Sequence, residues 1–84
     1  MTEERLIEIL KQVSNNDDYI ILVDNAPARI DGDTIWVEGA YGESDSYYLS
    51  ALKIHKVRPT YISISLDGSW YELEITKKMN IDEL

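Results

Sequence analysis

Cysteine is absent from this chain of 84 residues, and histidine occurs once. The chain therefore has neither a disulfide nor a thiolate zinc site, and one histidine cannot provide the nitrogen ligands of an ordinary zinc centre. The sequence also lacks a calcium-binding loop, a glycine-rich phosphate loop and a nucleophile elbow. We expect no metal site, no cofactor and no catalytic activity, and packing must stabilise the fold.

Phenylalanine is absent as well, and the aromatic residues are six tyrosines and two tryptophans. Such rings bury apolar area and also form hydrogen bonds, a combination that is common at binding interfaces. In a domain this small, however, aromatic side chains lie near the surface in any case. The composition favours a binding surface slightly over a purely structural role.

Long apolar runs are also missing. No segment approaches the roughly 18 residues that are needed to cross a membrane. Residues 1–4 are acidic, and they lack the basic and apolar regions of a secretory signal. We therefore expect a cytoplasmic protein with no membrane partner.

Positive charge is scarce, and negative charge is concentrated in one segment. The net charge is −8, and residues 17–45 hold eight carboxylates against one cation, Arg29. The following residues, 46–66, contain no acid and carry Lys53, His55, Lys56 and Arg58. A field of one sign repels polyanions and attracts basic surfaces. We therefore expect a basic protein partner and no direct contact with nucleic acid, and we expect the basic residues to pair with acidic loops of the same fold.

Residues 3–14 are predicted to form an amphipathic helix. Leu6, Ile9, Leu10 and Val13 follow the i, i+3, i+4, i+7 spacing of one helical face. Thr2 is a suitable N-cap. A helix of this length is marginal alone, so we expect its apolar face to pack on a sheet.

Two strand patterns follow the helix. Residues 19–23 form a continuous apolar run, rich in β-branched residues, that is typical of a central strand. Residues 28–30 and 34–38 flank Asp31-Gly32, which predicts a hairpin in which Ala28 faces Ile35. Trp36 then lies on the face opposite Ile35. Pro27 is expected to keep the first of these strands short or at an edge.

Residues 60–76 show the clearest hairpin, with Asp67-Gly68 as its turn. Pairing Leu66 with Ser69 places alternating apolar residues on one face, and the helix is expected to cover that face. The other face carries Tyr61, Ser63 and Ser65 opposite Glu74, Glu72 and Trp70.

The apolar residues of segment 46–57 match neither the helical period of about 3.6 residues nor the strand period of two. We favour a strand over a helix for this segment. The predicted fold is α+β: an N-terminal amphipathic helix packed on one face of a four- or five-stranded antiparallel sheet. We expect a single domain over residues 1–84, with residues 77–84 as a loose C-terminal tail.

The leading functional hypothesis is a small acidic protein-binding inhibitor or adaptor that engages a basic, nucleic-acid-binding partner through an acidic surface. In size, acidity and lack of catalytic motifs, the chain resembles phage-encoded inhibitors of nucleic-acid-handling machinery, including anti-CRISPR proteins, and the immunity proteins that block nuclease toxins. Such an inhibitor would mimic a nucleic acid if its carboxylates were spaced like phosphates along one surface, and a solvated acidic face is the alternative interpretation. The candidate partner-binding residues are Asp17, Asp18, Asp24, Asp31, Asp33, Trp36, Glu38, Glu43, Asp45, Tyr61, Trp70, Glu72 and Glu74.

Two other functions stay open. A Trp/Tyr strand face would also serve self-association, which predicts a homodimer with a structural or accessory role. A small enzyme is the third alternative, with His55 as its candidate general base. No nucleophile motif or partner acid accompanies that histidine in the sequence.

Overall fold

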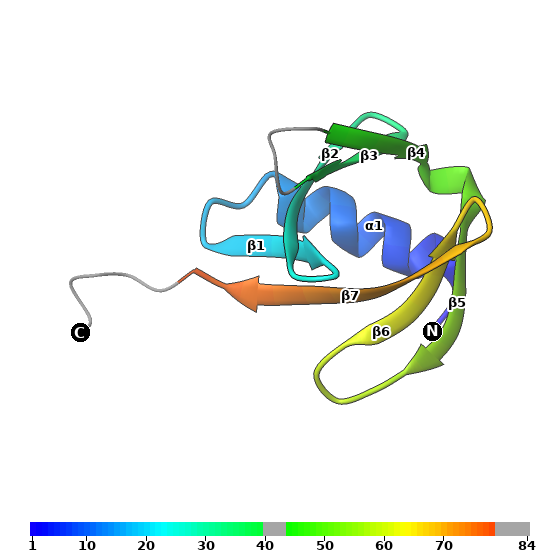
Figure 1. Cartoon of the computed structure of the whole chain (residues 1–84). Helices are drawn as coiled ribbons and strands as arrows, with labels where there is room; N and C mark the ends of the chain where they lie inside the picture. Colours follow the sequence, from blue (N-terminus) through cyan, green and yellow to red (C-terminus); the bar gives the residue numbers. More distant parts are fainter. Residues whose placement is uncertain (40–43, 79–84) are drawn as a thin grey trace.

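The computed structural model, which describes residues 1–39 and 44–78, contains one helix and a curled sheet of seven antiparallel strands (Figure 1). The predicted α+β class is confirmed, whereas the predicted count of four or five strands is wrong. The order across the sheet is β4-β3-β2-β1-β7-β6-β5. The elements are α1 (Glu3–Ser14), β1 (Tyr19–Val23), β2 (Ala26–Asp31), β3 (Thr34–Glu38), β4 (Ser44–Tyr48), the 3-10 turn η1 (Leu49–Ala51), β5 (Leu52–Val57), β6 (Ile62–Leu66) and β7 (Ser69–Lys77).

Helix α1 has the predicted bounds and lies against the concave side of the sheet (Figure 1). The Thr2 hydroxyl accepts a hydrogen bond from the Arg5 backbone N–H at 3.2 Å, which confirms the predicted cap. Leu6 and Leu10 are fully buried in a core formed with residues of β1, β3, η1, β5, β6 and β7. At the end of the helix, the Ser14 hydroxyl bonds both the N–H and the carbonyl of Ile30 in β2.

The strand count exceeds the prediction because residues 44–57 form two strands, β4 and β5, where at most one was expected. Strand β2 is also longer than predicted, because the turn before it is short. Asp24 and Asn25 both have positive φ, 49° and 65°, and they make a two-residue turn between β1 and β2. Residues 46–57 contain the end of β4, all of η1 and all of β5. The strand interpretation of that segment is therefore correct. The 3-10 turn within it explains why its apolar residues follow neither a regular helical nor a regular strand spacing.

Pro27 lies in an internal strand, which corrects the expected short or edge strand. It stands opposite Leu22 of β1, but the register between β2 and β3 begins only at Ala28. Pro27 therefore lies outside the β2–β3 ladder, and its lack of an N–H removes no hydrogen bond from that ladder.

The β2–β3 turn differs by one residue from the predicted turn. Asp31 pairs with Thr34, so Gly32 and Asp33 form the loop, and Ala28 pairs with Val37 instead of Ile35. Because this register shift is two residues, each side chain keeps its predicted face. Trp36 lies opposite Arg29 and away from the core.

The β6–β7 hairpin is confirmed. Leu66 pairs with Ser69, and Ser65 pairs with Trp70 on the outer face. Asp67 and Gly68 have φ values of 52° and 85°, as a two-residue turn of this kind requires. Tyr61 precedes β6, and the ladder starts at Ile62, so the predicted pairing of Tyr61 with Glu74 lies beyond it.

Strands β4 and β5 are consecutive in the chain but occupy opposite edges of the sheet, and only three residues of η1 connect them. The sheet must therefore curl to bring its edges together. The hydroxyls of Tyr47 in β4 and Tyr71 in β7 lie 2.7 Å apart across the curl. This hydrogen bond, together with desolvation, raises the pKa of Tyr47 to about 12.

The end of the described chain is fixed to the start of the sheet. Lys77 is the last residue of β7, and the Lys78 N–H donates to the Asp18 carbonyl at 2.7 Å. Residues 77 and 78 of the predicted tail are therefore anchored by backbone hydrogen bonding. Residues 79–84, the rest of that tail, lie outside the described residues.

Candidate functional site

The acidic candidates from residues 17–45 fall into two groups at opposite ends of strands β1 to β4, because neighbouring strands run antiparallel. One group lies before β1 and around the β2–β3 turn. The other group lies at the β1–β2 turn, at the end of β3 and at the start of β4. The first group is Asp17, Asp18, Asp31 and Asp33, and the second is Asp24, Glu38 and Asp45. Glu43 lies outside the described residues. The structure thus divides a segment that is continuous in sequence.

Asp24 is held against β7 by two hydrogen bonds. Its N–H donates to the Glu72 carbonyl at 2.9 Å, and its Oδ1 accepts the Glu72 N–H at 2.7 Å. The β1–β2 turn therefore extends the ladder between β1 and β7. As a result, two acidic residues from distant parts of the sequence, Asp24 and Glu72, lie side by side.

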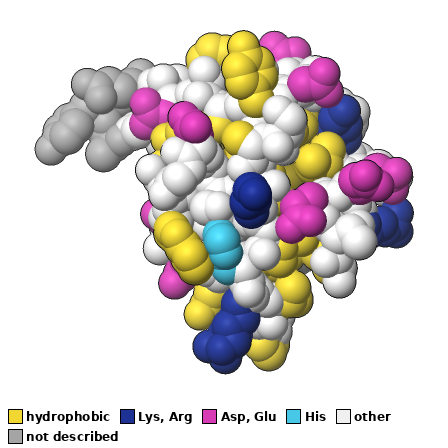
Figure 2. Space-filling model, turned by 90° about the vertical axis from the view of Figure 1, so that its right-hand side faces the viewer, with side chains coloured by type: hydrophobic (Ala, Val, Ile, Leu, Met, Phe, Trp, Pro, Cys, Tyr) yellow, Lys and Arg dark blue, Asp and Glu magenta, His cyan; other side chains and the backbone are white. Residues whose placement is uncertain are grey.

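Trp70 is the most informative of the predicted residues, because 63% of it is exposed although its ring is held in place. The His55 ring stacks on it with the centroids 3.7 Å apart and the planes 15° from parallel. The Nε2 atom of His55 also lies 2.8 Å from the hydroxyl of Ser65, which is buried beneath the pair. Figure 2 shows the histidine at the surface between a hydrophobic side chain and Lys or Arg side chains.

A local irregularity in β5 brings His55 to this position. The register between β5 and β6 shifts between Ile54 and Lys56, so His55 has no direct partner in β6. Such a bulge redirects a side chain. The imidazole from β5 and the indole from β7 meet above the small Ser65 of β6, which lies between these strands.

A shallow pocket of about 290 Å³ lies beside Trp70. Its lining consists of Asp24, Ser63, Trp70, Tyr71 and Glu72. Three predicted residues, Asp24, Trp70 and Glu72, are therefore brought together here. Ser63 and His55 were not among the candidate partner-binding residues. The alternation of β6 placed Ser63 on this face, but no sequence signal marked the bulge that directs His55 to Trp70.

Trp36 does not join this site. It lies half-buried on β3, which is separated from β7 by β2 and β1. The Arg29 guanidinium carbon is 5.4 Å from its ring centroid, a cation–π contact within the protein. Glu74 follows Glu72 on the same face of β7, but it stands opposite Leu22 and does not line the pocket.

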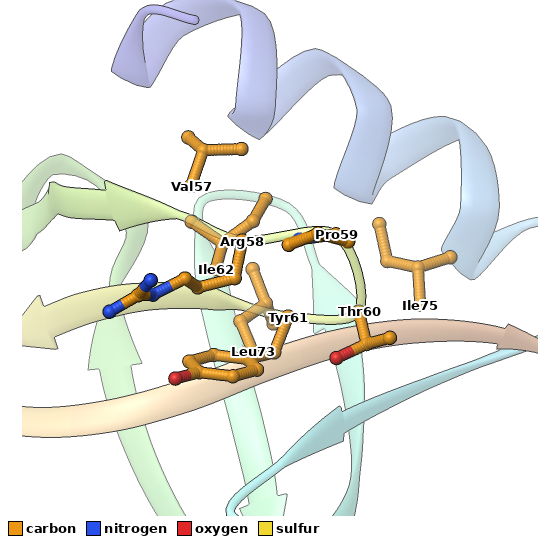
Figure 3. A pocket seen from close by; sticks show the side chains of 8 residues that line it. All are labelled: Val57, Arg58, Pro59, Thr60, Tyr61, Ile62, Leu73 and Ile75. Carbon is orange, nitrogen blue, oxygen red and sulfur yellow. The ribbon is translucent and has the colours of Figure 1, made fainter.

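Tyr61 lines a different, mostly apolar pocket of about 200 Å³ below the β5–β6 connection. Val57, Pro59, Ile62 and Ile75 are among its other lining residues (Figure 3). The Arg58 guanidinium and the Tyr61 hydroxyl point the same way, away from Pro59 and Ile75 (Figure 3). This pocket gathers no carboxylate and no histidine.

The expected pairing of the basic segment with acidic loops is not observed among the residues that the structure describes. Among residues 1–39 and 44–78, the two ion pairs are Arg5 with Glu8 and Lys11 with Asp33, each at 3.2 Å. Lys53, Lys56 and Arg58 take part in neither. Basic side chains therefore flank the β5 side of the His55–Trp70 pair, whereas carboxylates flank its β7 side.

In the part of the chain that the structure describes, no three His, Cys, Asp or Glu side chains are grouped as metal ligands would be. Within the same residues, no helix has the length and apolar content of a membrane span.

Comparisons with protein-family models, curated proteins and solved structures find no match to this chain. Its function must therefore be inferred from the surface around Trp70 and from the charge distribution.

Proposed function

We propose that this protein is a small acidic binding module, an inhibitor or adaptor, that engages a basic protein partner with Trp70 as its anchor. One observation carries the proposal: a largely exposed indole is stacked on His55 and borders a pocket that Asp24 and Glu72 line. Tryptophan is enriched among the residues that dominate binding energy at interfaces. A ring that is already ordered loses little further entropy when it binds.

The charge distribution supports a basic partner. A net charge of −8 on 84 residues favours rapid encounter with positive surfaces and opposes binding of polyanions. Proteins that handle nucleic acids carry such positive surfaces. We therefore propose a nucleic-acid-binding protein in the cytoplasm as the target, in the manner of the phage inhibitors and nuclease-immunity proteins that the chain resembles in size and acidity.

The test is a tagged pull-down from a lysate of the source organism, or of its host if the protein is viral, at low and high salt and with and without nuclease. We expect recovery of a basic protein that survives nuclease treatment and is lost at high salt. Trp70→Ala should lower the affinity for that protein by about tenfold or more. Tyr48→Ala is the matched control, because Tyr48 is 72% exposed but lies on β4. Salt-independent capture, or equal binding by the Trp70 variant, would contradict the proposal.

Self-association is the second candidate, because the exposed face of Trp70 would also fit a second copy of the chain. Repulsion between two chains of charge −8 opposes it at low salt. Sedimentation at several protein concentrations decides the matter: a dimer that dissociates in Trp70→Ala would support self-association, and a monomer at high concentration would exclude it.

A further inference from the structure

The pocket beside Trp70 differs from the rest of the acidic surface because it combines a flat aromatic ring with two carboxylates. Asp24 reaches it from the β1–β2 turn, Glu72 from β7 and Ser63 from β6. His55 covers one face of the indole and is not part of the pocket lining. The pocket therefore borders the indole on a side that His55 leaves open.

We propose that this pocket receives an arginine side chain of the partner. The inference rests on the proposed function, since it specifies which group of a basic partner is recognised. A guanidinium is planar and cationic, so it stacks on an indole and donates paired hydrogen bonds to carboxylates. The pocket offers both kinds of contact within about 290 Å³, close to the lower end of the roughly 300–1,000 Å³ of small-molecule sites.

The carboxylates are available for such a contact. Asp24 uses Oδ1 to accept the Glu72 N–H, which fixes the orientation of its carboxylate. Within residues 1–39 and 44–78, the Glu72 carboxylate is in neither of the two ion pairs. The cations Lys53 and Lys56 belong to β5, two strands away from β7, and neither of them lines the pocket.

An arginine is favoured over a lysine and over a nucleobase. A lysine ammonium is compact and does not stack as a plane, so it would use the carboxylates but only part of the ring. A base would stack on the indole, but its phosphates would approach Asp24 and Glu72 in a protein that is already strongly negative.

The experiment is an NMR titration of the intact protein that follows the Trp70 indole N–H resonance, with Trp36→Phe used to assign the two indole signals. The probes are a blocked Gly-Gly-Arg-Gly-Gly peptide and the same peptide with citrulline, which keeps the shape of arginine without its charge. We expect saturable binding of the arginine peptide, roughly in the millimolar range for so small a ligand, and no saturable shift with the citrulline peptide.

Matched variants locate the site. Glu72→Gln and Asp24→Asn should each weaken arginine binding by about threefold or more. Asparagine is chosen at position 24 because it tolerates the same turn conformation and keeps the Oδ1 acceptor. Glu74→Gln removes the same charge one position further along the face of β7, and it should change affinity by less than about twofold. Trp70→Ala, followed at the Ser63 backbone amide, should lower affinity by about tenfold. Thermal unfolding of each variant confirms that it is folded.

Three results would overturn the inference: equal shifts with the citrulline peptide, equal losses in Glu72→Gln and Glu74→Gln, or a larger Trp70 shift with a thymidine hexanucleotide than with the arginine peptide. If the peptide fails to bind while salt-sensitive, Trp70-dependent capture of a basic protein persists, the pocket assignment fails and the proposed function stands. If that capture fails as well, both are wrong.

Discussion

At the scale of single residues, the unusual feature is an exposed tryptophan that is not free to move. A ring that is mostly in water gains little from burial, yet Trp70 is stacked on His55, and His55 is bonded to Ser65. Aromatic stacking of this kind is worth about 0.5–1.5 kcal/mol. The arrangement orders the indole before any partner arrives, which is the property that an interface anchor needs.

His55→Ala should release the Trp70 ring. We expect a loss of about 1 kcal/mol in the free energy of unfolding, because one stacking contact and one partly buried hydrogen bond disappear. The time-resolved fluorescence anisotropy of Trp70, measured in a Trp36→Phe background, should show faster ring motion. Lys53→Ala on the same strand is the control and should leave the anisotropy unchanged. An unchanged anisotropy in His55→Ala would mean that the stack does not order the ring.

At the scale of secondary-structure elements, the edges of the open sheet need protection, since an unpaired edge strand invites further strands. On the β5 edge, the Glu3 carboxylate accepts the backbone N–H of Ile54 at 2.9 Å. The first turn of α1 thus occupies one donor of that edge. This hydrogen bond, followed by the N–H of Glu3 itself, holds the pKa of Glu3 below its ordinary value of 4.5.

Because the pKa of Glu3 is lower in the folded protein, its contribution to stability is present above the ordinary value of 4.5 and is lost as the pH falls through the folded value. Glu3→Gln should therefore reduce the fall in the thermal unfolding midpoint between about pH 5 and pH 2. The control is Glu4→Gln, since Ile54 donates its N–H to Glu3 and not to Glu4. If both variants titrate like the parent protein, the Glu3 contact does not contribute in solution.

At the scale of the whole molecule, one small core supports all seven strands. A chain of this length is stabilised by about 4–13 kcal/mol in total. Leu6 and Leu10 of helix α1 are fully buried in that core, so we expect the curled sheet to depend on packing against the helix.

Leu10→Ala should therefore consume much of the stability of the protein. We expect a loss of about 2–5 kcal/mol, measured by urea unfolding. Gln12→Ala is the control, because Gln12 is exposed on the same helix and alanine is a good helix former. A loss below 1 kcal/mol in Leu10→Ala would indicate that the helix is not needed to hold the sheet.

The sequence by itself determined what depends on neighbouring residues. The bounds of α1 follow from the spacing of Leu6 and Leu10 and from the Thr2 cap, and the β6–β7 register follows from the Asp67-Gly68 turn. The outward placement of Trp36 and Trp70 follows from strand alternation, which survives a register shift of two residues. The net charge is a property of composition alone.

Only the tertiary structure decided what depends on residues far apart in the chain. The curl of the sheet joins its two edges through η1, the β5 bulge brings His55 to Trp70, and the β1–β2 turn places Asp24 against Glu72. None of these contacts has a periodic signature, because each arises from strand order and from packing on the helix. The candidate site is therefore a product of the fold. The sequence shows which residue types are present, but it does not predict which of them lie next to one another.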